Sequence, residues 1–146
     1  MEDYYIRDLR IDDYNNNYLD LLNQLYSLSD ISKEFYVKQL ENIKTRTNYY
    51  IRIIEEKSTG KIVATGSIYI EFKFAYNLGK VAYIDDIIVD KDYRNKGLGK
   101  MLLAHLKRLG YANGAVYINV LVSEEYSKFF ESMGFSKDKN HYSIKL

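Results

Sequence analysis

The chain has 146 residues, and this length suits a single domain over residues 1–146 built on one hydrophobic core. Hydrophobic residues make up 47% of the sequence and charged residues 28%, which is ordinary for a globular protein and excludes a disordered chain. The net charge of +1 creates no overall field to attract nucleic acid or an acidic membrane, so we expect neither as a partner.

The sequence contains no cysteine, which excludes a disulfide framework, a thiolate nucleophile and cysteine-ligated zinc. Residues 1–5 are acidic and lack the apolar region of a secretory signal, and no apolar stretch is long enough to span a bilayer. We therefore expect a cytoplasmic protein. The two histidines are too few for a metal site, and we expect none.

The first half of the chain predicts strands and two helices. Weak alternation over residues 4–10 favours an opening strand. Helical spacing of apolar residues then occurs twice, first at Tyr18, Leu21, Leu22 and Leu25, and again at Tyr36, Leu40 and Ile43. Aromatic and β-branched residues predict a strand over 49–55, and residues 58–61 read as a hairpin turn.

The middle of the chain predicts two further strands. Residues 62–74 alternate cleanly, which indicates a long, half-buried strand. Residues 77–79 turn the chain, and residues 81–89 form the next strand. Together with residues 49–55 these segments predict an antiparallel meander.

The last third changes to a helical pattern. A helix is marked by apolar residues at Leu98, Leu102, Leu106 and Leu109, and residues 115–122 predict a buried strand. A second helix follows over 126–133, with Ser123 as its N-cap and Gly134 as its C-cap, and residues 141–146 predict a final strand. The element order predicts a mixed α/β domain.

One loop stands out for its chemistry. It lies between an apolar strand and an amphipathic helix, and it reads Arg94, Asn95, Lys96, Gly97, Leu98, Gly99 and Lys100. Glycines let the backbone approach a ligand, and the first amides of a helix point outward as donors in a positive field. The pattern predicts a phosphate or pyrophosphate site, against the alternative that the glycines serve only to turn the chain.

Two common phosphate motifs do not match this loop. A Walker A loop requires glycine where Arg94 stands and a hydroxyl residue where Met101 stands. A dinucleotide fingerprint requires a small residue where Leu102 stands. These mismatches disfavour a nucleotide-binding α/β protein.

The segment Arg-x-x-Gly-x-Gly at residues 94–99, together with Lys128 to Phe135, resembles the acetyl-CoA loop and later segment of the GNAT superfamily of N-acetyltransferases. The resemblance implies a mixed, mostly antiparallel sheet flanked by helices, with splayed fourth and fifth strands. It also implies direct acetyl transfer from acetyl-CoA to a small primary amine, and a homodimer. Donor contacts are implied for the loop, for the backbone of Ile87, Ile88 and Val89, and for Tyr126 and Phe130.

Within that superfamily, residues 64–73 and 84–87 are similar to the glucosamine 6-phosphate N-acetyltransferases, which carry Glu-Asp where this chain carries Asp85 and Asp86. Adjacent carboxylates inside an apolar strand are disfavoured by desolvation, so a role for at least one in accepting the ammonium or its proton is expected. The alternative is purely structural: one of the two carboxylates is a solvated residue at a strand edge, and the other pairs with a nearby lysine or arginine. Acceptor contacts are expected from Glu71, Lys73, Asp85 and Lys145.

Three positions depart from that pattern. Phe130 stands where many of these enzymes place a tyrosine that protonates or stabilises the leaving thiolate, Tyr126 replaces a donor-contacting asparagine, and Leu121 replaces an acidic residue. Either water or another tyrosine then protonates or stabilises the leaving thiolate, or CoA leaves as the thiolate. Because of these departures, the sequence leaves open the alternative that the protein is a non-catalytic regulatory module that binds acyl-CoA.

Overall fold

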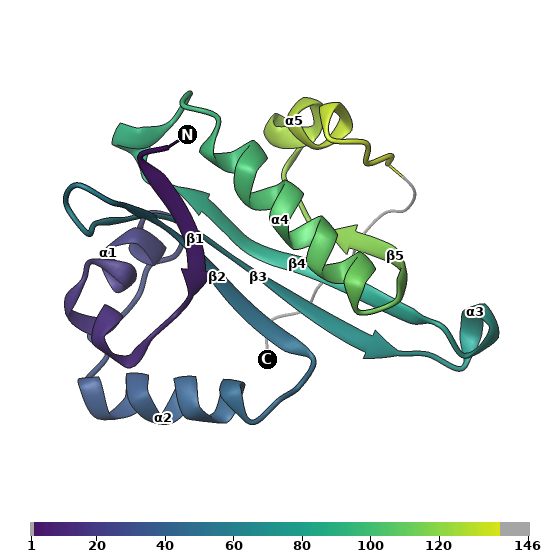
Figure 1. Ribbon diagram of the computed structural model, residues 1–146, viewed down its shortest axis with the longest axis horizontal. Coiled ribbons are helices and arrows are strands. Elements are labelled where there is room, and N and C mark those ends of the chain that lie inside the picture. Colours follow the sequence, from purple (N-terminus) through teal and green to yellow (C-terminus); the bar gives the residue numbers. More distant parts are fainter. Residues whose placement is uncertain (1, 138–146) are drawn as a thin grey trace.

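A five-stranded sheet runs through the protein in the order β1-β2-β3-β4-β5. Figure 1 shows the computed structural model, in which residues 2–137 are described. The strands are β1 (Tyr4–Asp8), β2 (Tyr49–Glu56), β3 (Ile62–Phe72), β4 (Lys80–Val89) and β5 (Ala115–Val120). Neighbours pair antiparallel except β4 and β5, which are parallel. This confirms the expected mixed, mostly antiparallel sheet; the strand expected at 141–146 lies outside the described residues.

Helices cover both faces of the sheet. They are α1 (Tyr18–Asn23), α2 (Lys33–Lys44), α3 (Ala75–Leu78), α4 (Leu98–Ala112) and α5 (Ser127–Ser132), with short 3₁₀ turns η1 (Ile11–Asn15), η2 (Lys91–Tyr93) and η3 (Glu124–Tyr126). Helix α4 supplies the crossover that two parallel strands require. Within residues 2–137, no helix is long and apolar enough to cross a membrane.

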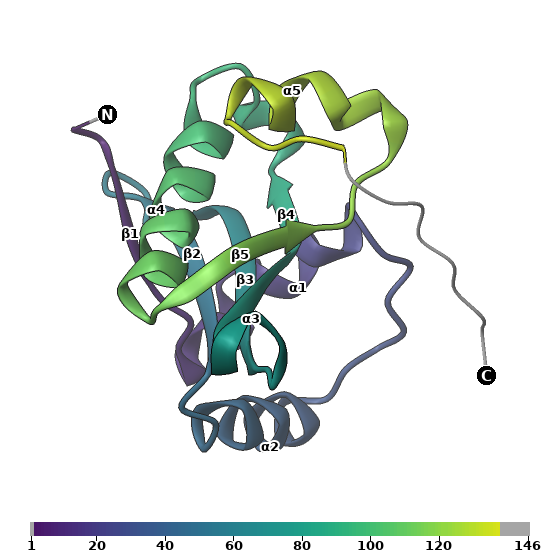
Figure 2. The same ribbon diagram turned by 90° about the vertical axis from the view of Figure 1, so that its right-hand side faces the viewer.

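The sheet separates two apolar clusters, as the arrangement of helices in Figure 2 suggests. Successive residues alternate between them. Ile54 and Val63 pack with α4, whereas Ile53 and Ile62 pack with α1 and α2. Strand β3 is therefore buried on both faces over most of its length, which corrects the half-buried expectation. Apolar and polar residues do alternate along β3, but the polar side chains of Thr65 and Ser67 are buried as well.

Three other expectations need correction. Helix α1 ends at Asn23, so Leu25 lies beyond it with 44% of its surface exposed. Strand β5 is the last strand of the sheet within residues 2–137, and Tyr117 is 56% exposed instead of buried. Ser123 is the N-cap of η3, while Tyr126 occupies the N-cap of the short helix α5. The sequence pattern gave the right type of element in each case, but tertiary position decided length and burial.

Arg7 joins three N-terminal elements through a buried ion-pair network. Its guanidinium donates to both carboxylate oxygens of Asp13 at 2.7 Å and, through Nε, to Glu55 at 2.7 Å. The Arg10 amide also donates to Asp13, at 2.7 Å. Burial raises the pKa of Asp13, but these hydrogen bonds outweigh it, and the pKa lies below its ordinary value. The network fixes η1 against β1 and β2.

Asp13→Asn is expected to lower the free energy of unfolding by roughly 2 kcal/mol at neutral pH, because it removes one of the two carboxylates that pair with the buried Arg7 charge and leaves only Glu55. A depressed folded pKa gives stability that is present above the ordinary aspartate pKa and lost as pH falls through the folded value. The difference in free energy of unfolding between wild type and variant should therefore become smaller in acid. Urea unfolding at a series of pH values measures this difference, and a difference that does not change with pH would contradict this role of Asp13.

Candidate functional site

A bulge interrupts β4 opposite β3. Thr65 pairs with Ile88 and Ser67 with Asp85, so residues 86 and 87 lie opposite Gly66 alone. Asp86 takes a left-handed backbone, with φ of 54°. That conformation costs a residue with a Cβ roughly 1 kcal/mol, so the surrounding structure must hold it. Bulges bend a strand and redirect its side chains, and this one lies at the acidic pair.

Beyond the bulge, β4 and β5 separate. Their parallel pairing ends at Ile84 and Val120, so residues 85–89 of β4 have no β5 neighbour. The Asp90 amide donates to the Val63 carbonyl of β3 at 2.9 Å. Because backbone directions alternate along a strand, the amides of Val89 and Ile87 point to the side that β5 leaves open, and that of Ile88 points toward β3. This gives a length of strand edge free to pair with a ligand.

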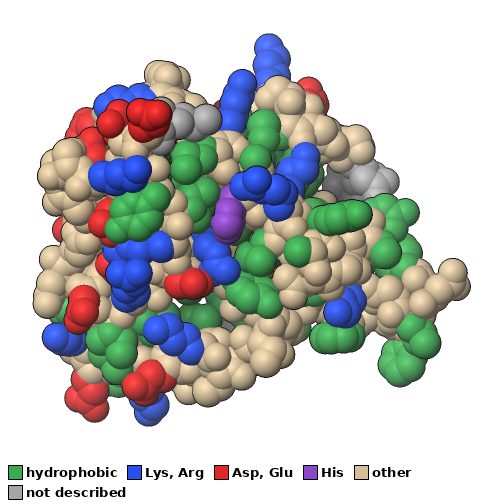
Figure 3. All heavy atoms as spheres, in the orientation of Figure 1, with side chains coloured by type: hydrophobic (Ala, Val, Ile, Leu, Met, Phe, Trp, Pro, Cys, Tyr) green, Lys and Arg blue, Asp and Glu red, His purple; other side chains and the backbone are tan. Residues whose placement is uncertain are grey.

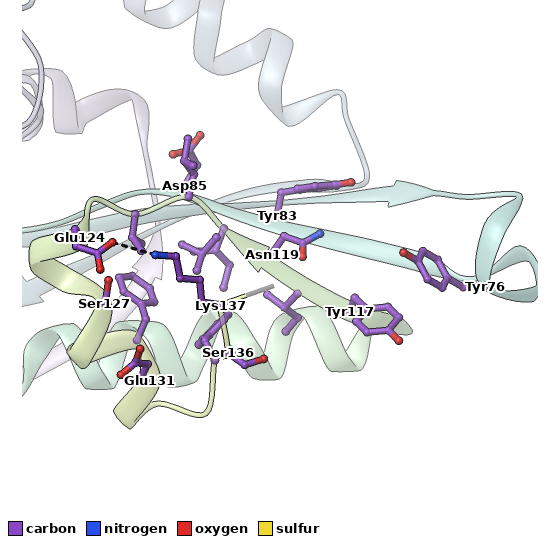
Figure 4. Close-up of a pocket in the computed structure, with 17 residues that line it drawn as sticks. Tyr76, Tyr83, Asp85, Tyr117, Asn119, Glu124, Ser127, Glu131, Ser136 and Lys137 are labelled. Carbon is purple, nitrogen blue, oxygen red and sulfur yellow. Dashed lines mark hydrogen bonds and ion pairs between the residues drawn. The ribbon is translucent and has the colours of Figure 1, made fainter. Parts of the chain in front are cut away.

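An open groove of about 1380 Å³ lies where the two strands separate. Figure 4 shows its walls, formed by β4, β5, α5 and residues 135–137. Polar residues of these elements line it, among them Tyr83, Asp85, Asn119, Glu124, Ser127 and Lys137, although the Asp85 carboxylate points to the opposite side of β4 from Glu124, Ser127 and Lys137 in Figure 4. The Lys137 ammonium lies 3.3 Å from the Glu124 carboxylate. Among the described residues, the groove therefore offers carboxylates, hydroxyls and the Lys137 ammonium to a polar ligand.

The two adjacent carboxylates have different surroundings. Asp85 is exposed and lines the groove, and its Oδ1 accepts the Asp86 amide at 2.9 Å. Asp86 does not line the groove; its carboxylate accepts a short hydrogen bond from the Tyr26 hydroxyl. Burial raises the pKa of Asp86, the Tyr26 hydrogen bond opposes that rise, and the nearby Asp85 charge adds to it. Of the pair, Asp85 is thus the carboxylate available to a ligand.

The glycine loop has the shape that its sequence predicted. Gly97 is the N-cap of α4 with φ of 80°, and a Cβ placed there would meet nothing within 4 Å. The first amide of the helix with an internal partner is that of Met101, which donates to the Gly97 carbonyl at 3.0 Å. The amides of residues 98–100 precede it and are the outward donors of the helix N-terminus. Open space and free amides together suit an anion.

The loop side chains divide by exposure. Arg94, Asn95, Lys96 and Lys100 are exposed, whereas Leu98 is 2% exposed within the core. Arg94 Nε donates to the Val89 carbonyl at 3.3 Å, which ties the loop to the end of β4. Leu98 therefore contributes only its backbone to the site, and the charges come from its neighbours.

The two aromatic residues predicted near the donor differ in exposure and in whether they line the groove. Phe130 lines the groove, is 7% exposed and packs edge-on against Phe129 and Phe135 at 5.2 and 5.7 Å between ring centroids. Tyr126 is 51% exposed and does not line the groove. Phe130 is therefore both core and groove wall.

The predicted acceptor residues lie near the rim of the groove. Lys73 and Glu71 form an ion pair with each other at 2.5 Å. The Lys73 ammonium lies 5.8 Å from the ring centroid of Tyr83, which lines the groove. Lys145 lies outside the described residues.

Several groove residues carried no clear signal in the sequence. Tyr83 could have been found, because it is two residues before Asp85 and so on the same face of β4. Tyr26 and Lys137 are distant in sequence from the residues they join here, and no pattern marked them. The part of the chain that the structure describes contains no group of three or more histidine, aspartate or glutamate side chains placed to hold a metal.

Comparison with known proteins gives a consistent result. Residues 5–135 match the sequence model of the acetyltransferase (GNAT) family. The chain is 35% identical to glucosamine 6-phosphate N-acetyltransferase of Arabidopsis thaliana, over 92% of this chain and 91% of the relative. It is 35% identical to glucosamine 6-phosphate N-acetyltransferase 1 of Dictyostelium discoideum, over 96% and 89%. The crystal structure of the Arabidopsis enzyme superposes with a TM-score of 0.95 at 33% identity, covering 98% of each chain.

The contacts of Asp86 predict opposite responses to two substitutions. Tyr26→Phe removes the hydrogen bond to the ionised carboxylate and should raise the pKa of Asp86, whereas Asp85→Asn removes a like charge and should lower it. Carboxyl ¹³C shifts followed by NMR through an acid titration measure both. Shifts of the same sign in the two variants would contradict the arrangement.

Proposed function

The chain belongs to the acetyltransferase (GNAT) family and is an acetyl-CoA-dependent N-acetyltransferase, and on that premise we propose that its acceptor is glucosamine 6-phosphate. The observation that carries the proposal is the likeness, over nine-tenths of the chain, to the two relatives whose names state that activity. Family membership and the activity named for these relatives favour an enzyme over the nucleotide-binding and non-catalytic alternatives.

Acetyl-CoA fits the site on chemical grounds. Its pantetheine arm carries amide groups, and the backbone of Ile87 and Val89 forms an edge that can pair with amides. Its pyrophosphate suits the amides of residues 98–100, where Gly97 leaves open space. The charges of Arg94, Lys96 and Lys100 surround that position. Side chains of Asn95, Tyr126 and Phe130 complete the proposed donor site, with Phe130 forming an apolar wall.

The reaction forms a bond between the acceptor nitrogen and the acetyl carbon, breaks the carbon–sulfur bond, and releases a proton. Asp85 lies in the groove and is the carboxylate placed to receive that proton or hold the ammonium. Asp86 supports it by donating its amide to the Asp85 carboxylate. A backbone amide of the open β4 edge is the donor available to the developing oxyanion.

Departure of the sulfur needs no side-chain acid in this proposal. Phe130 has no hydroxyl, so the sulfur leaves as the thiolate. The Ser127 hydroxyl, one helical turn before Phe130, faces the same groove (Figure 4) and is placed to stabilise that charge by a hydrogen bond.

A phosphorylated amino sugar also matches the polar character of the groove. Asp85 provides the negative charge for an ammonium, and Lys137 and Lys73 are the cations proposed to turn from their partners Glu124 and Glu71 toward a phosphate. Tyr83 and Asn119 offer hydrogen bonds to sugar hydroxyls. Glu71 acts through its ion pair with Lys73.

The proposal extends to assembly and location. We propose a single-domain protein that acts in the cytoplasm as a homodimer, without nucleic acid or membrane partners. Support for a second copy comes from the β3–β4 hairpin, which projects from the body of the molecule in Figure 1 and carries hydrophobic side chains at that end in Figure 3. The exposed apolar residues of this hairpin include Phe72, Phe74 and Leu78. The absence of cysteine suits a reducing compartment.

Steady-state release of free CoA thiol tests the acceptor. Turnover is expected with glucosamine 6-phosphate and at least tenfold lower kcat/KM with unphosphorylated glucosamine, because the phosphate contacts are lost. Spermidine serves as a non-sugar amine. No turnover of the phosphosugar beside clear turnover of another amine would reject this acceptor and leave the acetyltransferase assignment intact.

A further inference from the structure

The glycine loop is tied to the turn between β2 and β3 by a group of polar contacts around one ring. We call this the Tyr93 cluster, and its members are Glu56, Thr59, Lys61, Asp90, Tyr93 and Lys96. The Tyr93 hydroxyl donates to Glu56 Oε2 at 3.0 Å, and the same oxygen accepts the Thr59 hydroxyl at 2.7 Å. The Tyr93 ring also packs against the main apolar core. The ring is thus anchored at both its edge and its hydroxyl.

Two ammonium groups lie over this ring, and they differ in their partners. Lys61 Nζ is 4.8 Å from the ring centroid and also 3.0 Å from the carboxylate of Asp90, which is 4% exposed. Lys96 Nζ is 4.7 Å from the ring centroid and is exposed. Within residues 2–137, Lys96 has no carboxylate at ion-pair distance. The charge of Lys61 is therefore matched, while that of Lys96 is open to a ligand.

We propose that Tyr93, anchored by Glu56, is a positioning residue that holds the Lys96 ammonium beside the N-terminus of α4 for the phosphates of acetyl-CoA. Lys96 directly precedes Gly97, where the free amides begin. A lysine side chain loses much rotamer freedom when it binds, and a ring that restrains it beforehand reduces that loss. Through this contact the β2–β3 turn, distant in sequence from the loop, sets the affinity for the donor. The inference rests on the proposed acetyl-CoA site.

A double-mutant cycle on CoA affinity, measured by titration calorimetry, tests the coupling. Tyr93→Leu is expected to raise the Kd for CoA about three- to tenfold, and Lys96→Met by at least as much. Because Tyr93 acts through Lys96, the double variant should bind no more weakly than Lys96→Met alone. Lys61→Met is the matched control, since it removes the ammonium that Asp90 already neutralises, and its Kd should stay within about twofold of wild type.

Kinetics provides a readout that a merely structural role would not give. In Tyr93→Leu, the KM for acetyl-CoA should rise while kcat and the KM for the acceptor stay unchanged. Wild-type protein supplies a test that needs no variant, because a lysine held over Tyr93 shows upfield-shifted ε-methylene protons in its NMR spectrum.

Additive losses in the cycle, an unchanged Kd in a folded Tyr93→Leu, or unshifted Lys96 protons in the wild type would each overturn the inference. Failure of the wild type to bind CoA would instead overturn the proposed donor site, so the two failures are distinguishable.

Discussion

The site depends on one steric constraint, the absence of a side chain at Gly66 opposite the bulge in β4. A Cβ at this position would lie 3.1 Å from Leu106 and 3.3 Å from both Ile87 and Leu102. Those contacts are tighter than side chains normally allow, so glycine lets α4 and the bulged strand pack closely on β3. The bulge, at which Asp86 takes its left-handed conformation, lies directly opposite this glycine. The pairing of β4 with β5 ends at Ile84, just before the bulge.

The same bulge organises the charges of the site. At the bulge Asp85 is exposed at the rim of the groove, whereas Asp86 accepts a hydrogen bond from Tyr26, so that two neighbouring carboxylates have different surroundings. At the other end of the open edge, the N-terminus of α4 and the exposed side chains of Arg94, Lys96 and Lys100 make the region positive. Residues 85 and 89 are separated by four steps along the strand, or roughly 13 Å. An elongated ligand with an anionic end is therefore oriented in one direction along the edge, with its other end at the acidic groove.

The sequence predicted the parts of this arrangement that local patterns encode. Glycine spacing at residues 97 and 99 and the apolar phase of α4 located the anion loop, and alternation located β3 and β4. Family resemblance supplied the splayed strands, because the sequence pattern of β4 alone does not contain them. The burial of β5 was predicted incorrectly, since an apolar strand reads alike at the centre and at the edge of a sheet.

Other features arise only from tertiary contacts. Tyr26 meets Asp86 across 60 positions of sequence, and Glu56 meets Tyr93 across 37. No periodicity or spacing rule joins residues so far apart. For Phe130 the sequence alone shows that no hydroxyl is present at this position. Its contacts with Phe129 and Phe135 could be seen only in the fold.

The central claim, that the α4 N-terminus and open β4 edge bind acetyl-CoA, is tested most directly by comparing two glycines of one helix. Gly97 and Gly114 both have a positive φ, at 80° and 81°, and a Cβ at either would meet nothing within 4 Å. Gly97→Val and Gly114→Val should therefore introduce similar backbone strain at opposite ends of α4. Calorimetric titration with acetyl-CoA should show at least tenfold weaker binding for Gly97→Val alone, because its side chain fills the space before the amides. Equal affinities in the two folded variants would contradict the account.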